Sequence, residues 1–118
     1  MTNKYLNEEL LKFQPALSDE FRRSTDWDEG ICTSAHITYG QLLVHYIIEV
    51  IENNDTDEAK RIFEFINKLF ELNSDFVDDI LIMSVLLYFK LYIDISVYFA
   101  PHHKKTWKAW EDILKSPY

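Results

Sequence analysis

The segment that most constrains the fold is the apolar run at residues 74–100, SDFVDDILIMSVLLYFKLYIDISVYFA. Across residues 76–89 the apolar side chains fall at every helical angle, so a helix here is either buried on all sides or lies in a membrane. Its uninterrupted apolar part, residues 80–89, is much shorter than the roughly 20 residues that a membrane span needs. We therefore predict a central helix that the rest of the chain surrounds.

Two structures fit the second half of this run. Lys90 and Asp94 interrupt it, and residues 93–99 are dense in the β-branched and aromatic side chains that strands favour. The rest of the chain offers no second strand to pair with this one. We therefore expect the helix to continue to residue 100, with a strand over residues 93–99 as the alternative.

The rest of the chain carries amphipathic helical patterns. They cover residues 3–14, 15–23, 38–53, 56–72 and 103–115, with Trp107, Trp110, Ile113 and Leu114 on one side of the last. Thr38 with Gln41, and Asp55 with Glu58, have the spacing of a capping box. With only 2 Gly and 3 Pro, the sequence predicts an all-α fold: a single domain over residues 1–118, built as a compact bundle of about five or six helices in αα-hairpins around the central helix.

The negative charge is concentrated in one part of the chain. Residues 24–59 hold eight acids and no lysine or arginine, whereas the other residues hold 12 acids and 12 bases. Such clustering attracts a basic partner and repels nucleic acid. A solvated surface that keeps the protein soluble is the simpler alternative.

The longest predicted loop, residues 25–37, contains Trp27 among Asp26, Asp28 and Glu29. A tryptophan offers a large contact area and the carboxylates select a cationic partner, which is a composition typical of binding loops. The structural alternative is that Trp27 folds back onto the core.

A polar stripe follows the helix predicted at residues 38–53. Gln41, His45, Glu49 and Glu52 recur every three or four residues, opposite the apolar side of that helix. We expect these side chains to contact a partner, together with the acids of the loop, and Trp27 and Tyr39 to serve as apolar anchors.

Catalytic and metal signatures are weak. His45 and Glu49 have i, i+4 spacing, but a metal site needs three or four ligands. Cys32 and His36 suggest a thiol and imidazole pair without an orienting third group. His102 and His103 are expected to be solvated. We predict no enzyme activity, no metal and no cofactor.

The sequence also bears on location. A single cysteine excludes an intrachain disulfide, and the N-terminal residues lack the basic segment and apolar run of a secretory signal. We expect a cytoplasmic protein without membrane or nucleic-acid partners, and we leave its oligomeric state open.

Three stretches carry a resemblance to a known class of proteins: ITYGQLLVHYIIEVIENND, EAKRIFEFINKLFELNSDFVDDILIMSVLLYF and PHHKKTWKAWEDIL. Together they resemble the small acidic all-helical immunity proteins of bacterial polymorphic-toxin and contact-dependent inhibition systems. The shared features are a capped amphipathic helix, an aromatic-rich helix, an apolar helix, and a C-terminal helix with lysine and tryptophan.

The resemblance implies a protein that binds a cognate toxin domain and blocks it. The acidic segment fits a basic toxin. A helical scaffold or regulatory module with another protein partner is the alternative, and a small enzyme or metal protein that uses Cys32, His36, His45 and Glu49 is a third.

Overall fold

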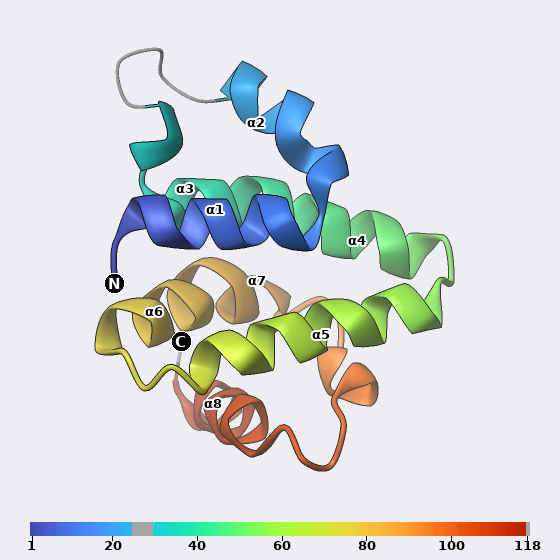
Figure 1. Ribbon diagram of the computed structural model, residues 1–118. Helices are drawn as coiled ribbons and strands as arrows, with labels where there is room; N and C mark the ends of the chain where they lie inside the picture. The colour runs from blue at the N-terminus through green and yellow to red at the C-terminus, as the bar shows by residue number, and fades with distance from the viewer. Residues whose placement is uncertain (25–29, 118) are drawn as a thin grey trace.

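The computed structural model describes residues 1–24 and 30–117, and these residues form helices and no strand. Helical segments that follow one another directly join into six rods (Figure 1). The predicted all-α bundle of about five or six helices is confirmed. The rods are α1 (Asn3–Phe13), η1 with α2 (Pro15–Leu17, Ser18–Ser24), α3 with η3 and α4 (Ala35–Thr38, Tyr39–Leu43, Val44–Glu52), α5 (Thr56–Phe70), α6 with η4 and α7 (Asp75–Ile80, Leu81–Leu86, Leu87–Phe89), and α8 (Lys104–Lys115).

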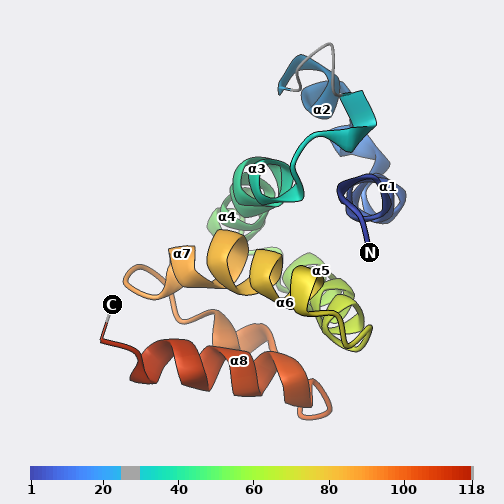
Figure 2. The same ribbon diagram turned by 90° about the vertical axis from the view of Figure 1, so that its left-hand side faces the viewer.

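The rods stack in layers, which Figure 2 shows from the side. The helix α1 lies beside the rod of α3 and α4, and α2 lies above them. The next layer holds α5 beside the rod of α6 and α7, and α8 closes the bundle on the far side. Two short 3₁₀ turns, η2 (Gly30–Cys32) and η5 (Ile95–Tyr98), lie in the connections.

The rod of α6, η4 and α7 is the centre of the core, as the sequence predicts. Its fully buried side chains are Val77, Ile80, Leu81, Val85, Leu86 and Phe89. The expectation that this helix is covered on all sides is wrong, because Phe76, Met83 and Tyr88 are between 40% and 56% exposed. The neighbouring layers therefore leave parts of the rod open to solvent, at its start as well as toward its end.

The central helix is also shorter than predicted. It ends at Phe89, and Asp94 then caps η5 by accepting a hydrogen bond from the Ser96 amide at 3.0 Å. Neither the predicted helix to residue 100 nor the alternative strand over residues 93–99 is present. The β-branched side chains of Ile93, Ile95 and Val97 have low helix propensity, which disfavours a continuation of the central helix through this segment.

The predicted start of the helix over residues 38–53 is also wrong. Helix begins at Ala35, inside the predicted loop, and Thr38 has helical torsions and makes no cap to its own helix. Asn3 of α1 supplies a partner for the first turn, since its Oδ1 accepts the Ala35 amide hydrogen bond at 3.0 Å. Because Asn3 lies 32 residues away, local spacing gives no sign of it.

The hairpin of α4 and α5 follows the prediction closely. Asn54 makes the turn in a left-handed conformation, with φ of 55°, and Asp55 Oδ1 accepts from the Glu58 amide at 3.2 Å. The Glu58 carboxylate, however, does not return to the cap. It turns inward to α1 and α4, which places it in the clamp described below.

The last helix, α8, packs under α5 and η4. A buried hydrogen bond of 2.9 Å from Thr106 Oγ1 to Asn67 Oδ1 joins α8 to α5. Trp110 and Ile113 are buried as predicted, but Leu114 is 51% exposed and does not belong to the packed side. The end of α8 thus presents an apolar residue to solvent.

Candidate functional site

The polar stripe on the rod of α3, η3 and α4 is exposed along its whole length. Gln41, His45, Glu49 and Glu52 all face solvent, while the opposite side of the rod is buried in the core. Helical periodicity produces this division, because residues three and four apart lie on one side of a helix. Leu43, Ile47 and Val50 are among the residues that anchor the buried side.

The stripe continues around the turn into α5, where Asp55 and Asp57 are also exposed. Within residues 1–24 and 30–117, no base forms an ion pair with Glu49, Glu52, Asp55 or Asp57. Acids elsewhere are mixed: Glu8, Glu9, Asp19, Glu58, Glu64, Asp79 and Asp112 each have a basic partner, whereas Glu20, Glu71, Asp75, Asp78, Asp94 and Glu111 form no ion pair among the described residues. The four carboxylates are set apart by following one another closely, all exposed, along α4 and the turn into α5. We call the surface made by Gln41, His45, Glu49, Glu52, Asp55 and Asp57 the acidic face.

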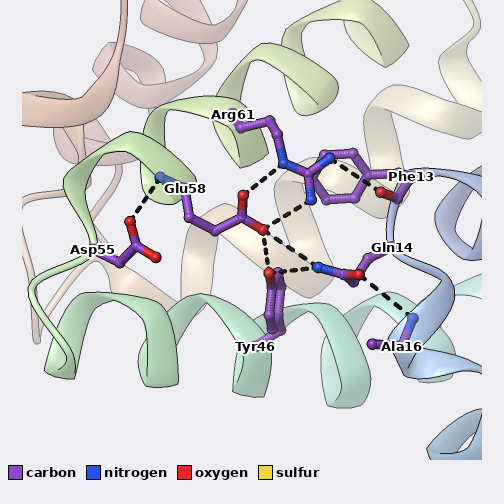
Figure 3. A network of polar contacts seen from close by, with 7 residues as sticks. All are labelled: Phe13, Gln14, Ala16, Tyr46, Asp55, Glu58 and Arg61. Atoms are coloured by element: carbon purple, nitrogen blue, oxygen red, sulfur yellow. Dashed lines mark hydrogen bonds and ion pairs between the residues drawn. The ribbon is translucent and has the colours of Figure 1, made fainter.

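A polar clamp behind the acidic face holds three helical segments together (Figure 3). Gln14 Nε2, just after α1, donates to the Tyr46 hydroxyl of α4 at 2.6 Å, and that hydroxyl donates to the Glu58 carboxylate of α5. Arg61 completes the clamp: it binds both Glu58 oxygens, donates to the Phe13 carbonyl at 3.1 Å and lies 4.1 Å from the centre of the Phe13 ring. The clamp therefore fixes the α4–α5 hairpin against α1.

The charges of the clamp depend on one another. Hydrogen bonds from Arg61 hold the pKa of the Glu58 carboxyl below its ordinary value. Burial, followed by the hydrogen bond to Glu58, raises the pKa of the Tyr46 hydroxyl. Glu58 is thus an anion whose charge Arg61 offsets, and it adds little to the field of the acidic face.

One predicted apolar anchor lies away from the acidic face. Tyr39 is fully buried, and its hydroxyl donates to the Leu6 carbonyl at 2.6 Å. The expectation that Tyr39 is a surface anchor is therefore wrong, because its ring packs in the core between α1 and the rod of α3. Asp26, Trp27, Asp28 and Glu29 lie outside the described residues.

Comparison with known protein families gives one result. A family model described as a domain of unknown function (DUF7674) matches residues 7–115. The chain belongs to the DUF7674 family. A comparison with curated proteins and a comparison with solved structures each find no match.

The DUF7674 domain has one group of three side chains, among the described residues, that could reach a common metal ion. Glu64 Oε2 lies 2.5 Å from His103 Nε2 and 3.3 Å from His102 Nε2. His103 is buried, contrary to its predicted solvation, and Glu64, which it contacts, lies 39 residues earlier in the chain.

The hydrogen bonds of His103 favour a structural role for this group. The Ala100 amide donates to His103 Nδ1 at 3.1 Å, so Nδ1 carries no proton and Nε2–H donates to Glu64. A metal at Nε2 needs the electron pair that this proton occupies. We therefore interpret the group as a hydrogen-bonded link between α5 and the start of α8.

The residues of the alternative enzyme or metal hypothesis are not gathered in one place. No third ligand stands near His45 and Glu49 among the residues the structure describes. His36 contacts the central rod instead, with Nδ1 2.6 Å from Ser84 Oγ and Nε2 3.4 Å from Asp79 Oδ2. Ser84 lies within a helix against the backbone of η3, which makes these contacts a link between two rods.

Sequence reasoning missed Asp55 and Asp57 as parts of the acidic face. Both belong to the acid-rich residues 24–59, so their charge was visible, but the spacing along one helix does not show that a surface continues around a turn.

No described helix is both long and apolar enough to cross a membrane.

Proposed function

We propose that the protein binds a basic partner protein through the acidic face. The observation that carries this proposal is the succession of four exposed carboxylates, Glu49, Glu52, Asp55 and Asp57, none of which forms an ion pair with a described residue. Like charges gathered on one surface repel one another, and a cationic partner relieves that repulsion.

The acidic face acts in two steps. Its field first attracts the partner, which can raise the association rate by about 10 to 1000-fold at low salt. Short-range contacts to Gln41, His45 and the carboxylates then hold the partner. The clamp of Gln14, Tyr46 and Glu58 keeps the hairpin in place before binding, so little conformational freedom is lost in the complex.

The specific partner that we propose is a bacterial toxin domain, which the protein neutralises by covering its active site. This follows from the resemblance of the helical stretches to acidic immunity proteins and from the basic character expected of nuclease-like toxins. Trp27, with Asp26, Asp28 and Glu29, belongs to the proposed contact as its apolar anchor and additional acids. In this proposal the protein acts by stoichiometric binding in the cytoplasm, without catalysis or a cofactor.

A helical scaffold or regulatory module is the second candidate. It uses the same acidic face toward a basic protein that is not a toxin. The two candidates differ in what the partner does when it is released from the complex.

A tagged pull-down from lysate of the source cell, at about 0.05 M and about 0.5 M salt, tests the proposal. We expect one stoichiometric basic protein at low salt and its loss at high salt, and mass spectrometry identifies it. A recovered protein that stops cell growth when expressed alone supports toxin neutralisation, while a harmless one supports the scaffold. Recovery of no basic protein at low salt contradicts both.

A further inference from the structure

Large apolar side chains gather at one end of the molecule, around the end of α7 and the end of α8. Leu91 is 81% exposed and Tyr92 is 74% exposed, both in the turn that follows α7. Met83, Tyr88 and Leu114 are between 48% and 56% exposed. We call these five side chains the apolar patch.

The apolar patch surrounds two hollows that adjoin along the last turn of α8. A hollow of about 660 Å³ between η4 and α8 is lined by Met83, Leu87 and Ile113 among others. A second hollow of about 460 Å³ is lined by Leu91, Tyr92, Trp107, Trp110 and Leu114 among others. The Lys90 ammonium donates to the Ser116 carbonyl at 2.7 Å and thereby ties the end of α7 to the end of α8 between the hollows.

The size of the apolar patch is close to what a protein interface needs. Five large side chains, each at least 48% exposed, present on the order of 600 Å² of surface. That is the upper end of the largest apolar patches found on monomers, and it approaches the roughly 800 Å² that each partner buries in a standard interface. Exposed aromatic and methionine side chains are also the types that interface cores favour.

The charges around the apolar patch favour a second copy of this chain as the partner. Lys90, Asp94, Glu111 and Asp112 line the hollows, and Lys108 pairs with Asp112 at 3.1 Å. Bases and acids are thus nearly balanced here, although the chain as a whole carries a net charge of −8. Two copies of an acidic protein repel each other least through such a surface, and a two-fold contact can set bases of one copy against acids of the other.

We propose that two copies of the chain pack their apolar patches against each other in a two-fold symmetric dimer. The rod of α3, η3 and α4, which carries most of the acidic face, lies in a different layer of the bundle from α7 and α8, whose ends carry the apolar patch (Figure 2). The dimer therefore leaves both acidic faces open, and the complex would hold two partner molecules. This inference does not depend on the proposed function.

Sedimentation equilibrium of the whole chain at about 1 to 100 μM tests the dimer. We expect the wild-type protein to have twice the monomer mass at the upper concentrations, without loss of the dimer at about 0.5 M salt, because apolar contacts are not screened. The double variant Leu91→Lys with Tyr92→Lys should shift the dissociation constant upward at least 100-fold. Both side chains are largely exposed, so the variant should keep the wild-type circular dichroism and melting temperature.

The matched control carries Ile37→Lys and Phe76→Lys, which replace two other exposed apolar residues with the same charges. It should dimerise like the wild type. A wild-type protein that stays monomeric at 100 μM overturns the proposal, and so does a dimer that the Leu91 and Tyr92 variant leaves intact. A monomer that binds an apolar dye at the hollows also overturns it and assigns the patch to another apolar ligand.

Discussion

Arg61 holds Glu58 through two hydrogen bonds, from Nε to Oε1 at 2.6 Å and from Nη2 to Oε2 at 2.9 Å. Both residues lie on α5, three positions apart, but the pair reaches beyond its own helix. Glu58 accepts from Tyr46 of α4, and Arg61 donates to the Phe13 carbonyl of α1. One ion pair therefore joins three helical segments behind the acidic face.

Replacing Arg61 by methionine should destabilise the protein by about 1–3 kcal/mol, because the partly buried Glu58 carboxylate loses its charged donors. Urea unfolding measures this change. Arg22→Met is the matched control, since it removes an exposed ion pair within α2 and should cost less than about 0.5 kcal/mol. Equal losses in the two variants would show that the clamp contributes no more than an ordinary surface pair.

The pH dependence of stability should reflect the lowered pKa of Glu58, caused mainly by Arg61, and of Glu64, caused mainly by His103. A carboxyl group whose pKa is lower in the folded state than in the unfolded state stabilises the fold fully when the pH is above its ordinary pKa of 4.5. This stabilisation is lost as the pH falls through the pKa of the folded state. Unfolding free energy should therefore decline below about pH 5.

The Glu58→Gln variant checks the sign of this effect. It should be less stable than the wild type at pH 7 and should decline less steeply in acid, because its clamp no longer depends on ionisation. Glu49→Gln, on the exposed stripe, is the control and should keep the wild-type profile. A Glu58→Gln profile parallel to that of the wild type would contradict the assignment.

His103→Ala should destabilise the protein by about 2–3 kcal/mol, since it removes a buried donor to Glu64 and the acceptor of the Ala100 amide. His102→Ala should change stability by less than about 0.5 kcal/mol, because that side chain is exposed. Thermal unfolding of both variants decides the matter. Similar losses for His102 and His103 would indicate that both serve a shared ligand instead of one structural link.

The fold was predictable where local signals agree with the packing. Asn54 in the turn, the Asp55 and Ser74 caps and the periodicity of α5 were all visible in the sequence. The start of α3 was not, because Asn3 from another helix supplies its cap partner. The end of α7 was missed because apolar residues continue past Phe89, and their pattern does not show that Leu91 and Tyr92 remain in solvent.

The sequence allowed the exposed polar stripe of the candidate site to be predicted, but it did not allow the position of the apolar anchor Tyr39 to be predicted. Helical spacing correctly placed Gln41, His45, Glu49 and Glu52 on the exposed side of their rod. Tyr39 was misplaced because the helix begins three residues before the predicted start, and its ring turns toward α1. The clamp partner Gln14 lies 32 residues from Tyr46, a distance that no local pattern spans.

Tyr39→Phe tests the corrected position of Tyr39. Loss of the buried hydrogen bond to the Leu6 carbonyl should cost about 1 kcal/mol of stability. Affinity for the partner recovered by the pull-down should stay the same, because a buried hydroxyl cannot contact it. Thermal unfolding and a titration of that partner measure the two effects, and a weakened complex with unchanged stability would restore Tyr39 as a surface anchor.

The most direct test of the acidic face is the association rate with the recovered partner, measured by stopped flow at several salt concentrations. Reversing Glu49 and Glu52 to lysine should slow association at least tenfold at low salt and flatten its salt dependence. The matched control reverses Glu8 and Glu111, exposed or half-exposed acids outside the acidic face, and should retain most of the wild-type rate. Equal rates for the two double variants would contradict binding through the acidic face.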